Sequence, residues 1–307
     1  MIPMQNDDAL IIESLPARRT ALGSIEIFRA LPRSRRRMVG PWCFLDRYGP
    51  LSFTTTKPMD VAPHPHMGLQ TVSWLAAGEI VHKDSLGYEA LMTAGQLNLM
   101  TSGHGIAHSE ETPKENSGQL EGLQMWVALP DDHRLVAPSF DHYASLPVLE
   151  IGSARMTVII GEVIGHKSPA KSFSPIVGAE LLFDEDQHAD QHVDLPLAPG
   201  FEHAVFVLSG NASLNGMPIA PNALHYIQPG RHELGITGTR GCRLVLIGGE
   251  PFREPVLMWW NFVARTSEEM ARAREDWEVH RRFGEVRAYN GPRLPAPELT
   301  GAGSHRW

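Results

Sequence analysis

Two similar stretches decide the fold, and the first reads Gly68-Leu69-Gln70-Thr71-Val72-Ser73-Trp74-Leu75-Ala76-Ala77-Gly78. The second reads Gly200-Phe201-Glu202-His203-Ala204-Val205-Phe206-Val207-Leu208-Ser209-Gly210. Each is a run of β-forming residues between two glycines, and each is followed by a second turn and strand. Two copies of one β-unit predict two similar β-barrels in a single chain.

Further short runs of β-type residues lie on both sides of these stretches, with glycine and proline scattered between them as turn signals. Examples are residues 25–28, 123–127 and 243–247. A chain of 307 residues is long enough for two domains of ordinary size. We therefore predict an all-β protein with an N-terminal domain over residues 1–135 and a C-terminal domain over residues 136–307.

One helix is expected near the C-terminus, over residues 266–282. Thr266 and Glu269 have the spacing of a capping box, and the residues that follow are good helix formers without Gly or Pro. A modest apolar stripe is formed by Met270, Ala273 and Trp277. The helix, counted with the C-terminal domain, is expected to pack on the outside of a barrel and to carry no chemistry.

Two pairs of polar residues in the first copy point to a metal. In His64-Pro65-His66 and in His108-Ser109-Glu110 the polar residues are two positions apart, so that on a strand both members of a pair face the same way. Three imidazoles and one carboxylate suit Fe(II), Mn(II), Co(II), Ni(II) or Cu(II), and the absence of thiolates argues against a structural zinc site. Four protein ligands would leave two positions of an octahedral ion open for substrate or dioxygen.

Chance is the alternative explanation, because a chain with 15 histidines will contain some H-x-H pairs. Two such pairs, each beside glycine turns in a β-rich context, favour a metal site over four unrelated residues. A metal-free binding scaffold is a further alternative. The second copy offers His203 without a partner two residues away, so we expect no metal there.

Composition excludes several classes of function. The net charge of -8 repels phosphate backbones and anionic membranes, so we expect no nucleic-acid partner and no membrane association. Arg33, Arg35, Arg36 and Arg37 form one cationic run, which is interpreted as a solvated face. Two distant cysteines, an N-terminus without signal-peptide features and the lack of a long apolar run predict a cytoplasmic protein.

Several motifs together resemble the pirin family over residues 15–290. They are Cys43-Phe44-Leu45-Asp46, His64-Pro65-His66-Met67-Gly68, Met100-Thr101-Ser102-Gly103-His104-Gly105-Ile106-Ala107-His108-Ser109-Glu110, Leu123-Gln124-Met125-Trp126-Val127-Ala128-Leu129-Pro130, Gly249-Glu250-Pro251, Glu254-Pro255-Val256 and Phe262-Val263. The resemblance implies a double cupin, two β-barrels facing each other, with a metal-binding N-terminal and a degenerate C-terminal cupin domain.

The resemblance also implies a cofactor and a function. The metal would be iron, Fe(II), with Mn, Co, Ni, Cu or Zn as alternatives, and its ligands would be His64, His66, His108 and Glu110. The implied activity is a metal-dependent dioxygenase of the quercetin 2,3-dioxygenase type, acting on a flavonol or a related enol or phenol. The alternative is an iron-dependent redox-sensing or metal-sensing regulator that binds a protein partner, either a transcription co-regulator or a metabolic enzyme.

One position departs from the family pattern. Pirins usually read Gly-Phe-Glu-Thr after the first histidine pair, whereas this chain has Gln70, which cannot act as a base. The catalytic base is therefore unassigned. Residues expected to line the cavity or support the ligands are Gln70, His82, His104 and Met125. For His82 a hairpin histidine and for Met125 core packing are equally simple explanations, and a turn alone explains the glycines beside His104.

Overall fold

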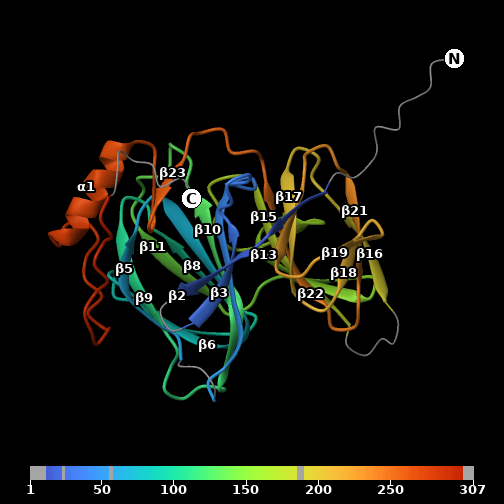
Figure 1. The fold of residues 1–307 in the computed structure, drawn as a ribbon, viewed down its shortest axis with the longest axis horizontal. Coiled ribbons are helices and arrows are strands. Elements are labelled where there is room, and N and C mark those ends of the chain that lie inside the picture. Colours follow the sequence, from blue (N-terminus) through green and yellow to red (C-terminus); the bar gives the residue numbers. More distant parts are fainter. Residues whose placement is uncertain (1–11, 23–24, 55–57, 185–189, 300–307) are drawn as a thin grey trace.

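The computed structural model describes residues 12–22, 25–54, 58–184 and 190–299. Figure 1 shows two β-rich lobes side by side, with one helix, α1 (Ser267–Glu278), on the outside of the lobe formed by the first half of the chain. The all-β prediction is confirmed. The residues on which the signal-peptide interpretation depends lie outside the described part.

The first lobe is built on a sheet with ten strands among the described residues, seven of which form one continuous path. Along that path they are β11 (Ser139–Tyr143), β8 (Leu97–Thr101), β6 (Leu69–Asp84), β10 (Gln119–Ala128), β4 (Trp42–Ser52), β3 (Ile25–Leu31) and β2 (Arg18–Leu22). Three more strands curl over one face: β5 (Asp60–His66), β7 (Glu89–Thr93) and β9 (Ile106–Glu111).

The second lobe repeats this arrangement. Its path is β1 (Ile12–Pro16), β20 (Ala223–Ile227), β17 (Glu202–Ser209), β22 (Arg243–Gly249), β15 (Ile176–Phe183), β13 (Ala154–Val163) and β12 (Val148–Ile151), with β14 (His166–Lys167) beside β13. A small sheet covers it, formed by β16 (Gln191–Pro196), β21 (Glu233–Gly238), β18 (Ala212–Leu214) and β19 (Met217–Ile219).

The internal repeat seen in the sequence has a counterpart in the topology. β6 and β17 carry the two similar stretches and hold the same place in their sheets. β6 lies between β8 and β10, and β17 lies between β20 and β22. All these neighbours are antiparallel, so the two copies also share their pairing pattern. The prediction of two similar β-barrels is therefore confirmed.

The sheet of each lobe is completed by an edge strand from the other half of the chain. β1, which precedes the whole first lobe, pairs with β20, while β11, which follows residue 135, pairs with β8. The expected boundary between residues 135 and 136 stays a prediction. The two halves of the chain, however, exchange one edge strand each across that point.

A shared core joins the two lobes. One cluster of buried residues contains Trp42 and Trp74 from the first lobe together with Ile160 and Phe206 from the second. The indole Nε1 of Trp42 donates to the carbonyl oxygens of Val177 and Gly248, each at 3.1 Å. Because both the apolar surfaces and these hydrogen bonds cross between the lobes, the sheets pack face to face as one body.

The helix is shorter than the expected range of 266–282. It begins as expected, because the Thr266 side chain caps it by accepting from the backbone N–H of Glu269. It ends at Glu278 because His280 adopts a left-handed conformation with φ of 58° and the N–H of Arg281 turns back to the carbonyl of Asp276. Within the described residues no helix has the length and the apolar character needed to cross a bilayer.

The C-terminal segment returns to the first lobe. The hairpin of β23 (Leu257–Trp259) and β24 (Phe262–Ala264) lies against the end of β5, where the N–H of Val263 donates to the carbonyl of Met67. Gly68 makes this approach possible, since a Cβ there would lie 2.1 Å from the carbonyl oxygen of Val263. Residues far apart in the sequence thus meet beside His66.

Candidate metal centre and cavity

Three neighbouring strands place their polar residues in register. β9 lies between β5 and β6, and His108 on β9 is directly opposite His64 on β5 and Asp84 on β6. One step along, Glu110 on β9 is opposite His82 on β6. Because side chains alternate along a strand, the members of each pair two residues apart face the same side of the sheet. The inward face therefore gathers three such pairs, one from each strand.

The three histidines expected as ligands come together. His64, His66 and His108 are all buried, and one ligand atom from each lies within 4.8 Å of the others. Nδ1 of His64 donates to the carbonyl oxygen of Ala62 at 2.9 Å, and Nδ1 of His66 donates to that of Asn261 at 3.2 Å. With Nδ1 occupied in this way, each ring presents an unprotonated Nε2 to the centre of the cluster.

The cluster has the chemistry that a cation requires. Burial lowers the pKa of His64 to about 4, and burial also lowers the pKa values of His66 and His108 well below that of a free imidazole. The Nε2 atoms of His66 and His108 lie only 3.0 Å apart. Two lone pairs at that distance repel each other unless a positive ion joins them. Cis ligands of an ion with metal–nitrogen bonds of about 2.1 Å lie about 3.0 Å apart, so the residues fit a divalent metal.

Glu110 lies beside this cluster but belongs to a second, overlapping group, formed with His82 and His108. Its Oε1 is 3.2 Å from the hydroxyl of Ser73, which also lies 2.7 Å from Oε1 of Gln124. The single hydroxyl proton can serve only one of these acceptors at a time. Burial raises the pKa of Glu110. The structure therefore brings three of the four expected ligands into one group and places Glu110 in the overlapping group, with its carboxylate turned towards Ser73.

His82 and Asp84 support the cluster from behind. Nδ1 of His108 is 3.3 Å from Nδ1 of His82, and Nε2 of His82 is 3.2 Å from Oδ2 of Asp84. Asp84 is a pure acceptor here, since its Oδ1 receives the backbone N–H groups of Leu86 and Tyr88. His82 must then donate from Nε2 to Asp84 and accept at Nδ1 from His108, which leaves Nε2 of His108 free for a metal.

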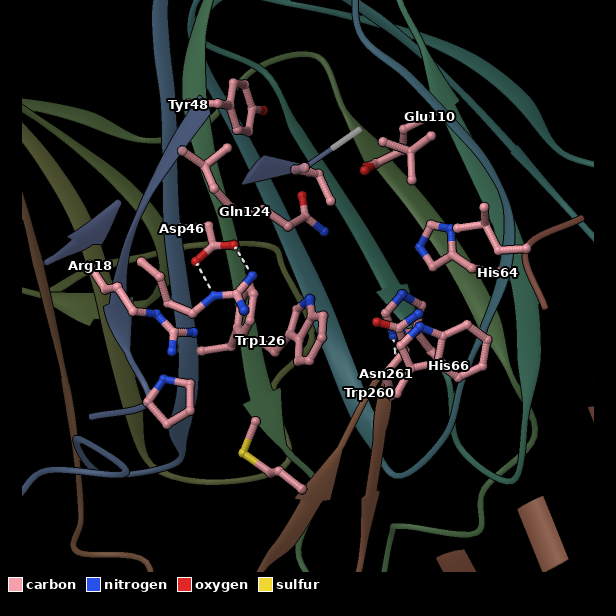
Figure 2. Close-up of a pocket in the computed structure, with 18 of the residues that line it drawn as sticks. Arg18, Asp46, Tyr48, His64, His66, Glu110, Gln124, Trp126, Trp260 and Asn261 are labelled. Carbon is pink, nitrogen blue, oxygen red and sulfur yellow. Dashed lines mark hydrogen bonds and ion pairs between the residues drawn. The ribbon is translucent and has the colours of Figure 1, made fainter. Parts of the chain in front are cut away.

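A cavity of about 400 Å³ opens in front of the cluster. Figure 2 shows His64, His66 and Glu110 on one side of it and Arg18 and Asp46 on the other, with Trp126 and Gln124 between them. Its volume is that of a site for a small organic molecule.

The cavity wall contains a stacked aromatic pair and an ion pair. The rings of Phe44 and Trp126 are parallel to within 12° with centroids 3.9 Å apart. Arg29 lies over Phe44 at 4.6 Å and holds Asp46 through two hydrogen bonds of 2.9 and 2.7 Å. Burial raises the pKa of Asp46 to about 6, although Arg29 opposes this rise. The bidentate contact fixes the side chain of Arg29, and the carboxylate of Asp46 neutralises its charge.

The remaining expected residues have different positions. Gln70 is buried away from the cavity, where its amide donates to Oγ1 of Thr101 and to the carbonyl of Lys171, which lies between β14 and β15 of the second lobe. Met125 is part of the core shared by the lobes, and His104 is exposed in a turn. Among the four supporting candidates, His82 is the one that contacts a histidine of the cluster. Because Gln70 does not reach the cavity, its difference from the family pattern removes no base from the wall.

The arginine run is only partly a solvated face. Arg35 and Arg37 are exposed as expected, but Arg33 lines the cavity. Arg36 pairs with Glu13 and Glu202 across the lobes and lies 3.5 Å from the ring centroid of Tyr226. For these two positions the interpretation was wrong, because the strands of the first lobe turn the chain back over the cavity mouth.

Other residues of the site were not foreseen. Asp84 had a usable signal, since His82-Lys83-Asp84 repeats the two-residue spacing of the other pairs. Four residues near the C-terminus gave no local signal of a role in the site, yet they line the cavity: Met258, Trp260, Asn261 and Leu294. Only the docking of the C-terminal segment on the first lobe brings these residues to the histidines.

Comparisons with known proteins agree with this architecture. The Pirin family model matches residues 24–127, and the Pirin C-terminal cupin domain model matches residues 182–284. A Pseudomonas aeruginosa protein named "Putative quercetin 2,3-dioxygenase" is 40% identical over 94% of this chain and 91% of its own length. A pirin-like protein of Caulobacter vibrioides is 36% identical over 86% of this chain and 92% of its own.

Among solved structures, a crystal structure of quercetin 2,3-dioxygenase from Acinetobacter baumannii superimposes with a TM-score of 0.90. Its sequence is 43% identical, and the match covers 94% of this chain and 96% of that one. Two cupin domains, the full-length sequence matches and the fold lead to the same assignment: this chain belongs to the pirin family.

Proposed function

We propose that the chain is a metal-dependent dioxygenase of the quercetin 2,3-dioxygenase type, with iron held by His64, His66, His108 and Glu110. Its substrate would be a flavonol or a related enol or phenol. The names and the similarity of the Pseudomonas and Acinetobacter proteins support this choice of reaction. They support the class of reaction more strongly than they support any one substrate.

The observation that carries the proposal is the convergence of three neutral imidazoles, two of which line the cavity. Each of their Nδ1 atoms has a hydrogen-bond partner elsewhere, so each Nε2 is left to the centre of the cluster. A histidine cluster that served packing alone would satisfy its inward nitrogens with donors. Here two of those inward nitrogens face each other at 3.0 Å.

When bound, a divalent ion with open positions would supply a cationic centre for an enolate or phenolate oxygen and for dioxygen. The chain's own residues would do the rest. Phe44 and Trp126 offer a flat apolar wall for an aromatic ring. Asn261 orients His66, and the neighbouring Trp260 helps to exclude water from the cavity.

The test loads the purified protein with Fe(II) without oxygen and then adds quercetin and dioxygen. The expected result is uptake of oxygen with release of carbon monoxide, at a rate that depends on the metal content. His66→Ala should lose both the metal and the turnover, because it removes one of the two nitrogens that face each other. His104→Ala is the matched control, since this exposed histidine lies outside the cluster.

Elemental analysis accompanies each assay, so that a failure to bind metal is distinguished from a failure to react. If wild-type protein with a full complement of iron takes up no oxygen with quercetin and with simpler flavonols, the proposed reaction is wrong. If the protein binds no divalent metal under any loading condition, the metal centre itself is wrong.

A further inference from the structure

The cavity is cationic although the protein as a whole is acidic. The net charge of the chain is -8, but the cavity wall contains Arg18, Arg29 and Arg33 against the carboxylates of Asp46 and Glu110. A bound divalent metal would make the cavity more positive still. Low-dielectric walls of this kind concentrate the field of such charges and raise the local concentration of anions.

Two of these arginines differ from Arg29 in making no close ion pair. Arg29 is neutralised by its bidentate contact with Asp46. Arg18, which is exposed, and Arg33, which is half-buried, make no salt bridge with the residues that the structure describes, although both line the cavity. Arg18 is moreover directly opposite Arg29 on the neighbouring strand. The charge of Arg18 also acts on Asp46, so these three side chains together leave one net positive charge at this end of the cavity.

Two buried donors on the same wall also have no protein partner. Nε1 of Trp126 and the hydroxyl of Tyr48 have no hydrogen-bond partner among the described residues. Their side chains are almost completely buried, with 6% of Trp126 and 3% of Tyr48 exposed, and both line the cavity. Buried donors are normally satisfied, but both atoms are enclosed in the wall itself, so a ligand would have to displace neighbouring side chains to accept from them.

The arrangement of these groups across the cavity defines a ligand with two ends. Figure 2 shows Arg18 opposite the histidines, with Trp126 between them. Building on the proposed function, we infer that the preferred substrate is an aromatic enol or phenol that also carries an anionic group, such as a carboxylate, bound by Arg18 and Arg33. Its enol or phenol oxygens face the histidine end, and its ring lies along Trp126. A neutral flavonol would fill the histidine end alone.

The experiment compares the binding of three probes to the metal-loaded protein without oxygen, by quenching of tryptophan fluorescence. The probes are 3-hydroxyflavone, its 4′-carboxylate and its 4′-phosphate. We expect the carboxylate or the phosphate to bind at least tenfold more tightly than the neutral parent, with an advantage that falls as salt rises. The tighter of the two identifies the anion, and either result supports the inference.

Variants assign the effect to the two arginines. Arg18→Gln with Arg33→Gln should abolish the preference for the anionic probes over 3-hydroxyflavone. Arg35→Gln with Arg37→Gln changes the net charge equally at exposed positions of the same run and should keep the preference. If the first double variant does not fold, Arg33→Gln alone should reduce the preference at least threefold.

Equal binding of the three probes to wild-type protein would overturn the inference, and so would a preference that survives Arg18→Gln with Arg33→Gln. Turnover separates this result from the fate of the proposed function. If the protein takes up oxygen with 3-hydroxyflavone but binds the three probes equally, only the anion site is wrong. If the protein prefers the anionic probes but takes up no oxygen with any of the three, the proposed dioxygenase activity is wrong and the anion site is retained.

Discussion

The Nδ1 atoms of His108 and His82 lie 3.3 Å apart, and the other nitrogen of His82 contacts Asp84. The direction of both hydrogen bonds follows from Asp84, which can only accept. A chain of three side chains therefore sets the tautomer of His108 from the far side of the metal cluster.

Asp84→Asn should reverse the direction of the hydrogen bonds that link His108, His82 and residue 84. The amide oxygen of the new side chain will stay with the N–H groups of Leu86 and Tyr88, so its NH₂ group will face His82 and move the proton of His82 to Nδ1. Nδ1 of His108 then meets a donor, and metal affinity should fall by about 10–100-fold. Competition with a chelator measures the change. Unaltered affinity would show that Asp84 does not control the cluster.

Trp126→Phe separates the two roles of this indole. A phenyl ring keeps the stacking on Phe44 but removes the buried Nε1 donor. The free energy of unfolding should therefore change by about 1 kcal/mol or less, whereas Trp126→Ala should cost about 3–5 kcal/mol. Binding of a flavonol should weaken in both variants. Denaturant unfolding beside ligand titration gives both quantities, and flavonol affinity unaffected by Trp126→Phe would rule out the indole as a donor.

His203 predicts a pH dependence of stability in the second lobe. Burial lowers its pKa to about 4 in the folded protein, whereas the unfolded chain takes up the proton at about 6.5. The folded state is the one whose pKa is depressed, so its stability is complete above pH 6.5 and declines as the pH falls towards 4. Between pH 7 and pH 5 the loss amounts to about 2 kcal/mol.

His203→Gln removes the titrating group. The difference in unfolding free energy between pH 7 and pH 5 should shrink by that amount relative to wild type, as measured by urea unfolding at both values. A variant of exposed His104 should keep the wild-type difference. An undiminished pH dependence in His203→Gln would mean that the proton uptake takes place elsewhere.

Gly68→Ala should disturb the contact between the C-terminal segment and the metal cluster. Its φ of 73° already disfavours alanine, and the added Cβ would lie 2.1 Å from the carbonyl oxygen of Val263. We expect a loss of about 3 kcal/mol or more in stability, with lower metal retention because Asn261 orients His66. Gly87→Ala is the control, since Gly87 has a φ of 95° and no atom within 4 Å of its added Cβ. Equal losses in both would leave only the backbone conformation as the cause.

Local patterns were enough to predict the parts of the site that lie along single strands. His64 with His66 and His108 with Glu110 could be recognised because the two-residue period of a strand is visible in sequence. The same two-residue period relates His82 to Asp84, but only His82 was predicted as part of the site. The two β-units around Gly68 and Gly200 likewise disclosed the duplicated fold, because each unit is a continuous stretch.

What the sequence could not disclose depends on long-range docking. Asn261 is 195 residues from His66, its hydrogen-bond partner, and no periodicity connects them. Arg33 was misplaced for the same reason, since a run of arginines looks identical on a solvated face and at the mouth of a cavity. The helix end at Glu278 was also missed, because its last carbonyls are bound by Arg293 from beyond the helix.

Through the pairing of β1 with β20 and of β11 with β8, each half of the polypeptide supplies an edge strand to the sheet of the other half. A polypeptide divided after residue 135 would leave a bare edge on β8 in one fragment and on β20 in the other, and each fragment would still hold the strand that its counterpart lacks. Bare edges of this kind invite pairing with other chains. The fragments should therefore be aggregation-prone when made alone and complement each other when made together.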